Sequence, residues 1–210
     1  MEQFFKNRNL PAITIEDERQ AVSVANAVID GGLDIMEIPF RTPSAANCIK
    51  LIKESVPGLQ VGAGTILTPE QVVLAKESGA SFGLAPGFNP KVVKEAAMND
   101  FPLIPGVMTP SEVEFALELG CEIQKLFPAA QVGGISMLKA LLGPYGHTGV
   151  KFIPMGGVSL HNMVDYLEME NVLAIGGSWL ATKELIANKD YETITKNVRT
   201  AIDNYKLLNE

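Results

Sequence analysis

Cysteine is scarce in this chain of 210 residues, which contains only Cys48 and Cys121. These two lie far apart and form neither a close pair nor a spaced framework, so a disulfide scaffold is excluded. Histidine is equally scarce. His147 falls in a loop and His161 at a predicted helix start, without the spacing of metal ligands. We expect reduced thiols, no bound metal and no cofactor.

Long apolar runs and basic tracts are also missing. No apolar run approaches the length of a membrane span, and the start of the chain lacks the apolar core of a signal peptide. The formal net charge of -7 argues against a nucleic-acid partner. With 47% hydrophobic and 20% charged residues, the composition is typical of a folded soluble protein. We expect a single domain over residues 1–210, in the cytoplasm, with no membrane partner.

Short apolar segments alternate with segments of helical periodicity along the whole chain. Strands are predicted at residues 10–15, 33–39, 59–64, 81–85, 102–105, 122–128, 150–154 and 172–175, and a helical tail from 183 onward. Three helices end in a glycine suited to a left-handed C-cap: Asp30-Gly-Gly-Leu, Ser78-Gly-Ala-Ser and Leu119-Gly-Cys-Glu. Eight such strand–helix units predict a (β/α)8 TIM barrel. The alternative is a doubly wound sheet, but no Gly-x-Gly-x-x-Gly follows the first strand to support it.

A lysine stands in the middle of the sixth predicted strand. Lys125 is flanked by Ile123, Leu126 and Phe127, which give this segment the composition of a buried strand. A lysine is almost never buried without a partner. Lys125 is therefore either a side chain that reaches water from an edge strand, or an amine kept dry for nucleophilic attack as a Schiff base.

The carboxyl ends of the other strands carry further candidates, because barrel sites lie at these ends. Glu37 lies on the second strand and Arg41 follows it. Strand alternation and the barrel predict that Glu37 and Lys125 point into the same layer. Glu37 is either half of an ion pair with Arg41 or a catalytic group. Thr65, after the third strand, is either a ligand-binding residue or a helix cap.

Glycine pairs follow the last two strands, as Gly156-Gly157 and Gly176-Gly177 before Ser178. These pairs are typical either of ordinary turns or of a phosphate site built from backbone N–H groups. Barrels commonly have such a phosphate site at this position. Strand ends and neighbouring motifs add Pro86, Phe127, Met155 and Gly177 to the candidate substrate-binding residues.

Six motifs, in order along nearly the whole chain, resemble the 2-keto-3-deoxy-6-phosphogluconate (KDPG) and 4-hydroxy-2-oxoglutarate (KHG) aldolases. They are Glu37-Ile-Pro-Phe-Arg-Thr, Gly62-Ala-Gly-Thr-Ile-Leu, Pro105-Gly-Val-Met-Thr-Pro, Lys125-Leu-Phe-Pro-Ala, Gly156-Gly157 and Gly176-Gly-Ser-Trp-Leu. The resemblance implies a metal-independent class I aldolase on a TIM barrel, usually a homotrimer.

The resemblance also implies a role for each matching residue. Lys125 would form the Schiff base and Glu37 would act as the general acid/base. The pyruvate carboxylate would be held by Arg41 and Thr65, and the substrate phosphate by Gly156, Gly157 and Ser178. One position departs from the family pattern, because Met155 stands where threonine often precedes the glycine pair. This departure puts the selectivity for the acceptor aldehyde in question.

The predicted reaction is therefore cleavage of KDPG to pyruvate and glyceraldehyde 3-phosphate, together with cleavage of KHG to pyruvate and glyoxylate. The chemistry requires a lysine that is neutral at working pH. Burial and the charge of Arg41 are expected to lower the pKa of Lys125, and an ionised Glu37 would oppose them. The alternatives are an aldolase for the galactonate epimer, another phosphate-binding barrel enzyme such as an isomerase or decarboxylase, and a binding protein without activity.

Overall fold

The structure is a computed structural model that describes residues 1–207. The end of the predicted helical tail, residues 208–210, lies outside the described residues. The strands are β1 (Asn9–Pro11), β2 (Ile35–Pro39), β3 (Gln60–Gly64), β4 (Phe82–Leu84), β5 (Leu103–Ile104), β6 (Gly106–Val107), β7 (Ile123–Leu126), β8 (Lys151–Pro154) and β9 (Ile175–Gly177). The α-helices are α1 (Ala21–Asp30), α2 (Ala45–Ser55), α3 (Pro69–Glu77), α4 (Pro90–Met98), α5 (Pro110–Glu118), α6 (Gly134–Tyr145), α7 (Met163–Leu167), α8 (Lys183–Ala187) and α9 (Tyr191–Lys206).

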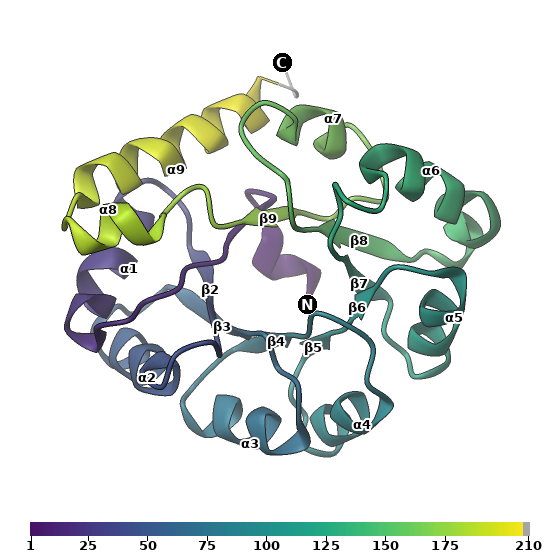
Figure 1. Cartoon of the computed structure of the whole chain (residues 1–210), viewed down its shortest axis with the longest axis horizontal. Coiled ribbons are helices and arrows are strands. Elements are labelled where there is room, and N and C mark those ends of the chain that lie inside the picture. The colour runs from purple at the N-terminus through teal and green to yellow at the C-terminus, as the bar shows by residue number, and fades with distance from the viewer. Residues whose placement is uncertain (208–210) are drawn as a thin grey trace.

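These strands form one parallel ring. Three hydrogen-bonded sheets have the orders β1-β9, β2-β3-β4-β5 and β6-β7-β8. Bridges from Ala12 to Glu37 and from Met155 to Gly176 join the first sheet to the other two. The ring is completed by the chain itself, since β5 and β6 are halves of one barrel strand separated by Pro105. Figure 1 shows this ring with the α-helices around it. The predicted (β/α)8 TIM barrel is confirmed.

Three strands differ from the prediction. The first spans Asn9–Pro11 rather than residues 10–15, and Ala12 after it makes only an isolated bridge, to Glu37. Proline lacks a backbone N–H, and Pro105 interrupts the fifth strand, although its carbonyl still accepts from the N–H of Lys125 at 2.8 Å. The eighth strand begins at Ile175 rather than Val172. Val172 makes only an isolated bridge, to Phe152, whereas Gly176 and Gly177 pair with β1. The prediction placed this strand too early because residues 172–175 are apolar, whereas the pair Gly176-Gly177 is typical of a turn.

Local signals set most helix boundaries. Thr68 and Thr109 each complete a capping box at the start of α3 and α5, with Pro following as the first helical residue. The predicted helix-ending glycines Gly32, Gly79 and Gly120 have φ values of 103°, 87° and 77°. This left-handed conformation costs glycine little, so each helix stops and leads into the next strand.

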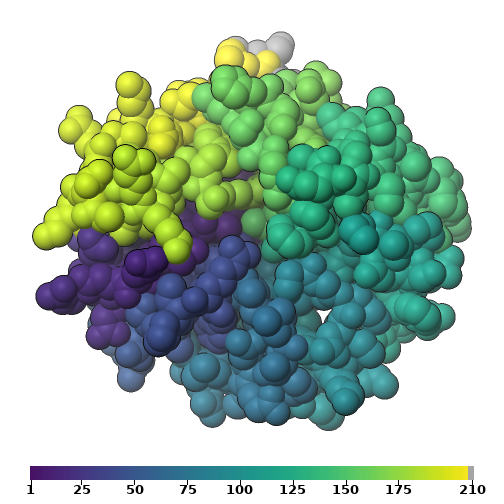
Figure 2. Space-filling view, in the orientation of Figure 1, coloured from purple at the N-terminus to yellow at the C-terminus, as the bar shows by residue number. Residues whose placement is uncertain are grey.

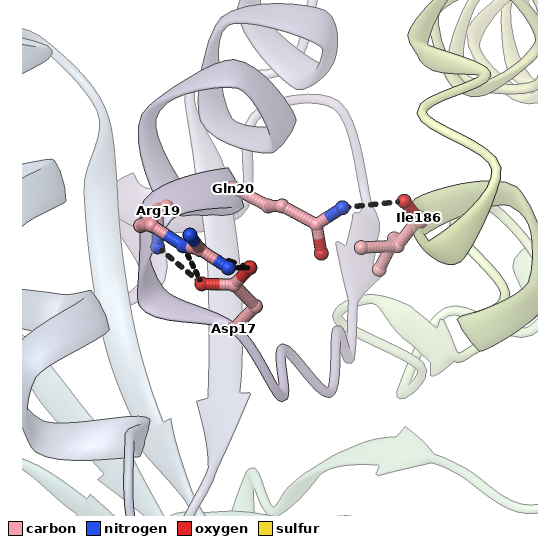
Figure 3. Close-up of polar contacts among 4 residues, drawn as sticks. All are labelled: Asp17, Arg19, Gln20 and Ile186. Carbon is pink, nitrogen blue, oxygen red and sulfur yellow. Dashed lines mark hydrogen bonds and ion pairs between the residues drawn. The ribbon is translucent and has the colours of Figure 1, made fainter.

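The first helix of the outer layer meets the last two helices, α8 and α9, on the outside of the barrel. Thr195 on α9 donates to the carbonyl of Ala27 on α1 at 3.0 Å. Gln20, just before α1, donates to the carbonyl of Ile186 on α8 at 2.9 Å (Figure 3). In the space-filling view of Figure 2, purple N-terminal and yellow C-terminal atoms accordingly border each other. These contacts close the helical layer around the ring.

Candidate active site

A cavity of about 270 Å³ opens where the strands end, and five barrel strands supply its walls. Its lining residues are Ala12, Thr14, Glu37, Pro39, Arg41, Lys125, Phe127, Met155, Gly156, Gly157, Val158, Gly177, Ser178 and Trp179. The cavity brings together nine of the eleven predicted site residues. Thr65 and Pro86 are the two that do not line it.

Lys125 is buried in this cavity rather than directed to water. Its strand β7 lies between β6 and β8 in the ring, so it is not an edge strand, and the side chain is only 3% exposed. Its Nζ lies 4.8 Å from the ring centroid of Phe127. Burial lowers the pKa of Lys125; the charge of Glu37 opposes this and that of Arg41 adds to it. The hypothesis that Lys125 reaches water from an edge strand is therefore wrong. The lowered pKa favours the neutral, nucleophilic form of the amine.

Glu37 lies on β2 and is 2% exposed. Its Oε2 is buried and has no hydrogen-bond partner among the described residues. Burial raises the pKa of Glu37, and the charges of Lys125 and Arg41 only partly offset that effect. Within residues 1–207, ion pairs join Arg19 to Asp17 and Lys183 to Glu16, and none joins Glu37 to Arg41. The ion-pair reading of Glu37 is therefore wrong.

A glycine makes room for this carboxyl group. Gly64 faces Glu37, and a Cβ atom at position 64 would lie 2.8 Å from Oε2 of Glu37. Because β3 has no side chain at position 64, the carboxyl group of Glu37 lies inside the barrel without displacing β3. The arrangement gives a proton donor and acceptor in the same cavity as the amine of Lys125.

Arg41 follows β2 at the rim of the cavity. Its Nε donates to Oγ1 of Thr65 at 3.0 Å. Thr65 has a φ of 58°, an unfavourable conformation for a β-branched residue. It is not the cap of α3, since Thr68 has that role. The helix-cap reading of Thr65 is wrong, and its hydroxyl instead orients a guanidinium that can bind a carboxylate through two N–H groups.

The glycine turn after β8 packs closely against the segment that follows β7. Gly156 and Gly157 have φ values of 88° and 80°. A Cβ atom at Gly157 would lie 2.3 Å from Cβ of Ala130. The backbone N–H groups of Gly157 and Ser178 donate to no acceptor within the described part of the chain. Free N–H groups on two glycine turns that line one cavity are suited to an anion such as phosphate.

Sequence reasoning missed several wall residues. Thr14 and Trp179 line the cavity, yet neither was predicted to be a site residue. The available signals were the position of Thr14 near the end of the first strand and that of Trp179, the only tryptophan, directly after Ser178. Pro86, in contrast, lies away from the cavity, where its backbone leaves room only for a glycine at position 106.

Residues 1–207 contain no group of three or more His, Cys, Asp or Glu side chains that could hold a metal ion. Within them no helix has the length and apolar character needed to cross a bilayer.

Comparison with known proteins adds three related findings. The profile of the family described as "KDPG and KHG aldolase" matches residues 2–197. A 2-dehydro-3-deoxy-phosphogluconate aldolase of Haemophilus influenzae is 44% identical over 194 residues, which cover 92% of this chain and 91% of the relative. A KHG/KDPG aldolase of Escherichia coli is 39% identical over 198 residues, covering 94% and 92% of the two chains.

A solved structure agrees with these sequences. KDPG aldolase from Legionella pneumophila, with pyruvate captured at low pH as a covalent carbinolamine intermediate, superposes with a TM-score of 0.91 and 36% identity. The match covers 94% of this chain and 95% of that one. Sequence, fold and the buried lysine–glutamate cavity thus agree, and the chain belongs to the KDPG and KHG aldolase family.

Proposed function

We propose that this chain is a class I aldolase that cleaves KDPG into pyruvate and glyceraldehyde 3-phosphate. One observation carries the proposal. Lys125 and Glu37 are both almost fully buried in one cavity, where burial shifts the pKa of each toward its neutral form. A neutral amine can attack a ketone, and a protonated carboxyl group beside it can supply the proton that the leaving oxygen needs.

The reaction then follows in five steps: addition, loss of water, cleavage, protonation and hydrolysis. The Nζ of Lys125 adds to the C2 ketone, and Glu37 protonates the carbinolamine oxygen, which leaves as water. Glu37, now a carboxylate, takes the proton of the C4 hydroxyl while the C3–C4 bond breaks. The bond electrons pass into the iminium, which forms an enamine as glyceraldehyde 3-phosphate leaves. Protonation at C3 and hydrolysis release pyruvate and restore the amine.

The remaining site residues bind the two ends of the substrate in this proposal. Arg41, oriented by Thr65, holds the carboxylate next to C2. The unpaired N–H groups of Gly157 and Ser178, with Gly156 and Gly177 beside them, hold the phosphate. Phe127 covers the amine. Pro86 stays a predicted contact, since it lies outside the cavity.

Two further substrates are related to KDPG, and their cleavage measures the substrate specificity of this site. KHG has the same reacting atoms and is proposed as a second substrate. The galactonate epimer is an alternative substrate, because Met155 is buried in the cavity and offers no hydrogen-bond donor to the substrate hydroxyls. The ratio of kcat/KM for the two phosphorylated epimers, compared with the ratio in Met155→Thr, measures how far Met155 determines this choice. An increase in discrimination is expected for the threonine variant.

Reduction with borohydride in the presence of pyruvate tests the mechanism directly. A Schiff base is reduced to a stable amine, so the protein should gain the mass of one reduced pyruvate adduct, located on the peptide containing Lys125. Lys125→Ala should give no adduct and no cleavage, whereas Lys94→Ala, at an exposed position on α4, should behave like the unmodified protein. An adduct that persists in Lys125→Ala would exclude this role, and no adduct in the unmodified protein would favour an isomerase or decarboxylase.

We further propose that the active form is a homotrimer of one barrel domain spanning residues 1–210, located in the cytoplasm. The mass of the assembly in solution, measured by light scattering, tests the oligomeric part of this proposal.

A further inference from the structure

Thr14 differs from the other threonines near the strand ends. The hydroxyls of Thr42 and Thr65 are hydrogen-bonded within the protein, and those of Thr68 and Thr109 cap helices. The Oγ1 of Thr14 makes no hydrogen bond with any residue from 1 to 207, and Thr14 lines the cavity. Its hydrogen-bonding capacity is therefore available to a bound ligand.

The segment that follows β1, residues 12–15, offers this cavity a single polar side chain. Alternate residues of an extended segment point to opposite sides, and Ile13 and Ile15 are fully buried in the core between strands and helices. Ala12 and Thr14 lie on the cavity side. Ala12 has only a methyl group, so Thr14 alone can form a side-chain hydrogen bond from this wall.

The neighbours of this segment after β1 fix where the Thr14 hydroxyl lies. On one side, the N–H of Ile13 donates to the carbonyl of Glu37 at 2.9 Å. On the other side, the N–H of Ala12 donates to the carbonyl of Gly177 at 3.0 Å. Thr14 thus extends from a wall that lies between the strand of the candidate acid/base and the strand that leads to Ser178.

The proposed substrate has the same order of groups. The C4 hydroxyl reacts at Glu37 and the C6 phosphate binds at the glycine turns, so the C5 hydroxyl lies between them. Met155, also in this cavity, cannot donate a hydrogen bond to it. Resting on the proposed function, we infer that the Thr14 hydroxyl binds the C5 hydroxyl of the substrate and selects aldehydes that carry a hydroxyl beside the carbonyl.

The test uses the reverse, aldol-forming direction, with pyruvate and two phosphorylated aldehydes. D-Glyceraldehyde 3-phosphate carries the hydroxyl that becomes the C5 hydroxyl, and 3-oxopropyl phosphate is the same molecule without it. The ratio of kcat/KM for the two aldehydes measures recognition of that one group. Thr14→Val keeps the shape but removes the hydroxyl, so the ratio should fall roughly 3- to 12-fold, as expected for one neutral hydrogen bond.

Two controls make the result specific. Thr14→Ser retains a hydroxyl and should keep most of the preference, whereas Thr200→Val, on α9 and away from the cavity, should leave the ratio unchanged. An unchanged ratio in Thr14→Val, or an equal loss on both aldehydes, would overturn the inference about Thr14. No aldol formation by the unmodified protein with either aldehyde would instead overturn the proposed function.

Discussion

At the amino-terminal end of the strands the barrel is filled by hydrocarbon, whereas at the carboxyl-terminal end it holds two buried ionisable side chains. In the first region, the rings of Phe4 and Phe5 lie 5.8 and 6.0 Å from that of Phe82. They belong to the 3-10 helix Glu2–Phe5, which lies inside the ring in Figure 1. Here burial of apolar surface in the cluster stabilises the fold, and one buried polar atom at this end, Oδ1 of Asn9 at the start of β1, has no hydrogen-bond partner within residues 1–207.

The second region works against stability. Glu37 and Lys125 are as buried as the core, yet Oε2 of Glu37 lacks a hydrogen-bond partner among the described residues. Burying such a group costs free energy, which the packed end must offset. The comparison teaches that most of the apolar residues that stabilise this barrel lie apart from the two residues that are proposed to react.

Two glycines on β3 show both regions side by side. A Cβ atom at Gly62 would lie 2.3 Å from Cε2 of Phe82, and one at Gly64 would lie 2.8 Å from Oε2 of Glu37. The same strand therefore leaves room for an aromatic ring at its middle and for a carboxyl group at its carboxyl end. The following experiments test whether the two regions can be perturbed separately.

The largest effect is expected at the reactive end. Glu37→Gln keeps the size of the side chain but removes its acid and base, so turnover should fall roughly 10²- to 10⁴-fold. Steady-state kinetics on KDPG measures this, and thermal unfolding should show no loss of stability. Near-normal turnover would remove Glu37 from the proton transfers.

A substitution at the packed end should lower stability and leave turnover nearly unchanged. Phe82→Ala removes a fully buried ring and should lower the free energy of unfolding by about 3–5 kcal/mol. Turnover per folded molecule should stay within a small factor of the original, because the cavity does not include position 82. Urea unfolding and kinetics at low temperature measure the two quantities. A large loss of turnover in the folded variant would show that the two regions are coupled.

Matched substitutions on β3 sharpen the comparison. Gly64→Ala should displace the carboxyl group of Glu37 and reduce kcat about 10- to 100-fold, since small displacements of a reacting group are costly. Gly62→Ala should instead crowd Phe82 and lower stability by about 1–3 kcal/mol, with kcat nearly retained. Both quantities are measured on both variants. The same profile for the two would contradict the separation.

A smaller effect is expected in the pH dependence of stability. Burial raises the folded-state pKa of Glu37 above its usual 4.5. The original protein therefore loses stability as pH rises from about that value through the folded pKa. Gln cannot titrate, so Glu37→Gln should gain stability relative to the original over this window. Urea unfolding at several pH values tests this, with Glu54→Gln on the exposed face of α2 as control. A constant difference would contradict the raised pKa.

The smallest effect, none, is expected from chelation. In the proposed mechanism the iminium on Lys125 accepts the bond electrons, so EDTA should leave kcat and KM unchanged. Activity lost on chelation and restored by a divalent ion would indicate a metal-dependent aldolase.

Much of this fold was readable from local sequence. The alternation of strand and helix patterns, the threonine caps Thr68 and Thr109, and the helix-ending glycines gave eight units and hence the barrel. These signals depend on residues within a few positions of one another, so the sequence order alone defines them. For the same reason, the sequence is sufficient to predict a candidate site at the lysine strand and the glycine pairs.

Only the tertiary structure decided which distant segments of the chain come into contact. Closure of the ring buries Lys125 and Glu37 together, shifts both pKa values and excludes the ion pair of Glu37 with Arg41. It also brings Thr14 into the cavity and leaves Pro86 outside. The strand through Gly176 and Gly177 exists only because β1 pairs with it. These outcomes depend on partners more than a hundred residues away in several cases, and burial, pKa and pairing are properties of the assembled neighbours rather than of any one segment.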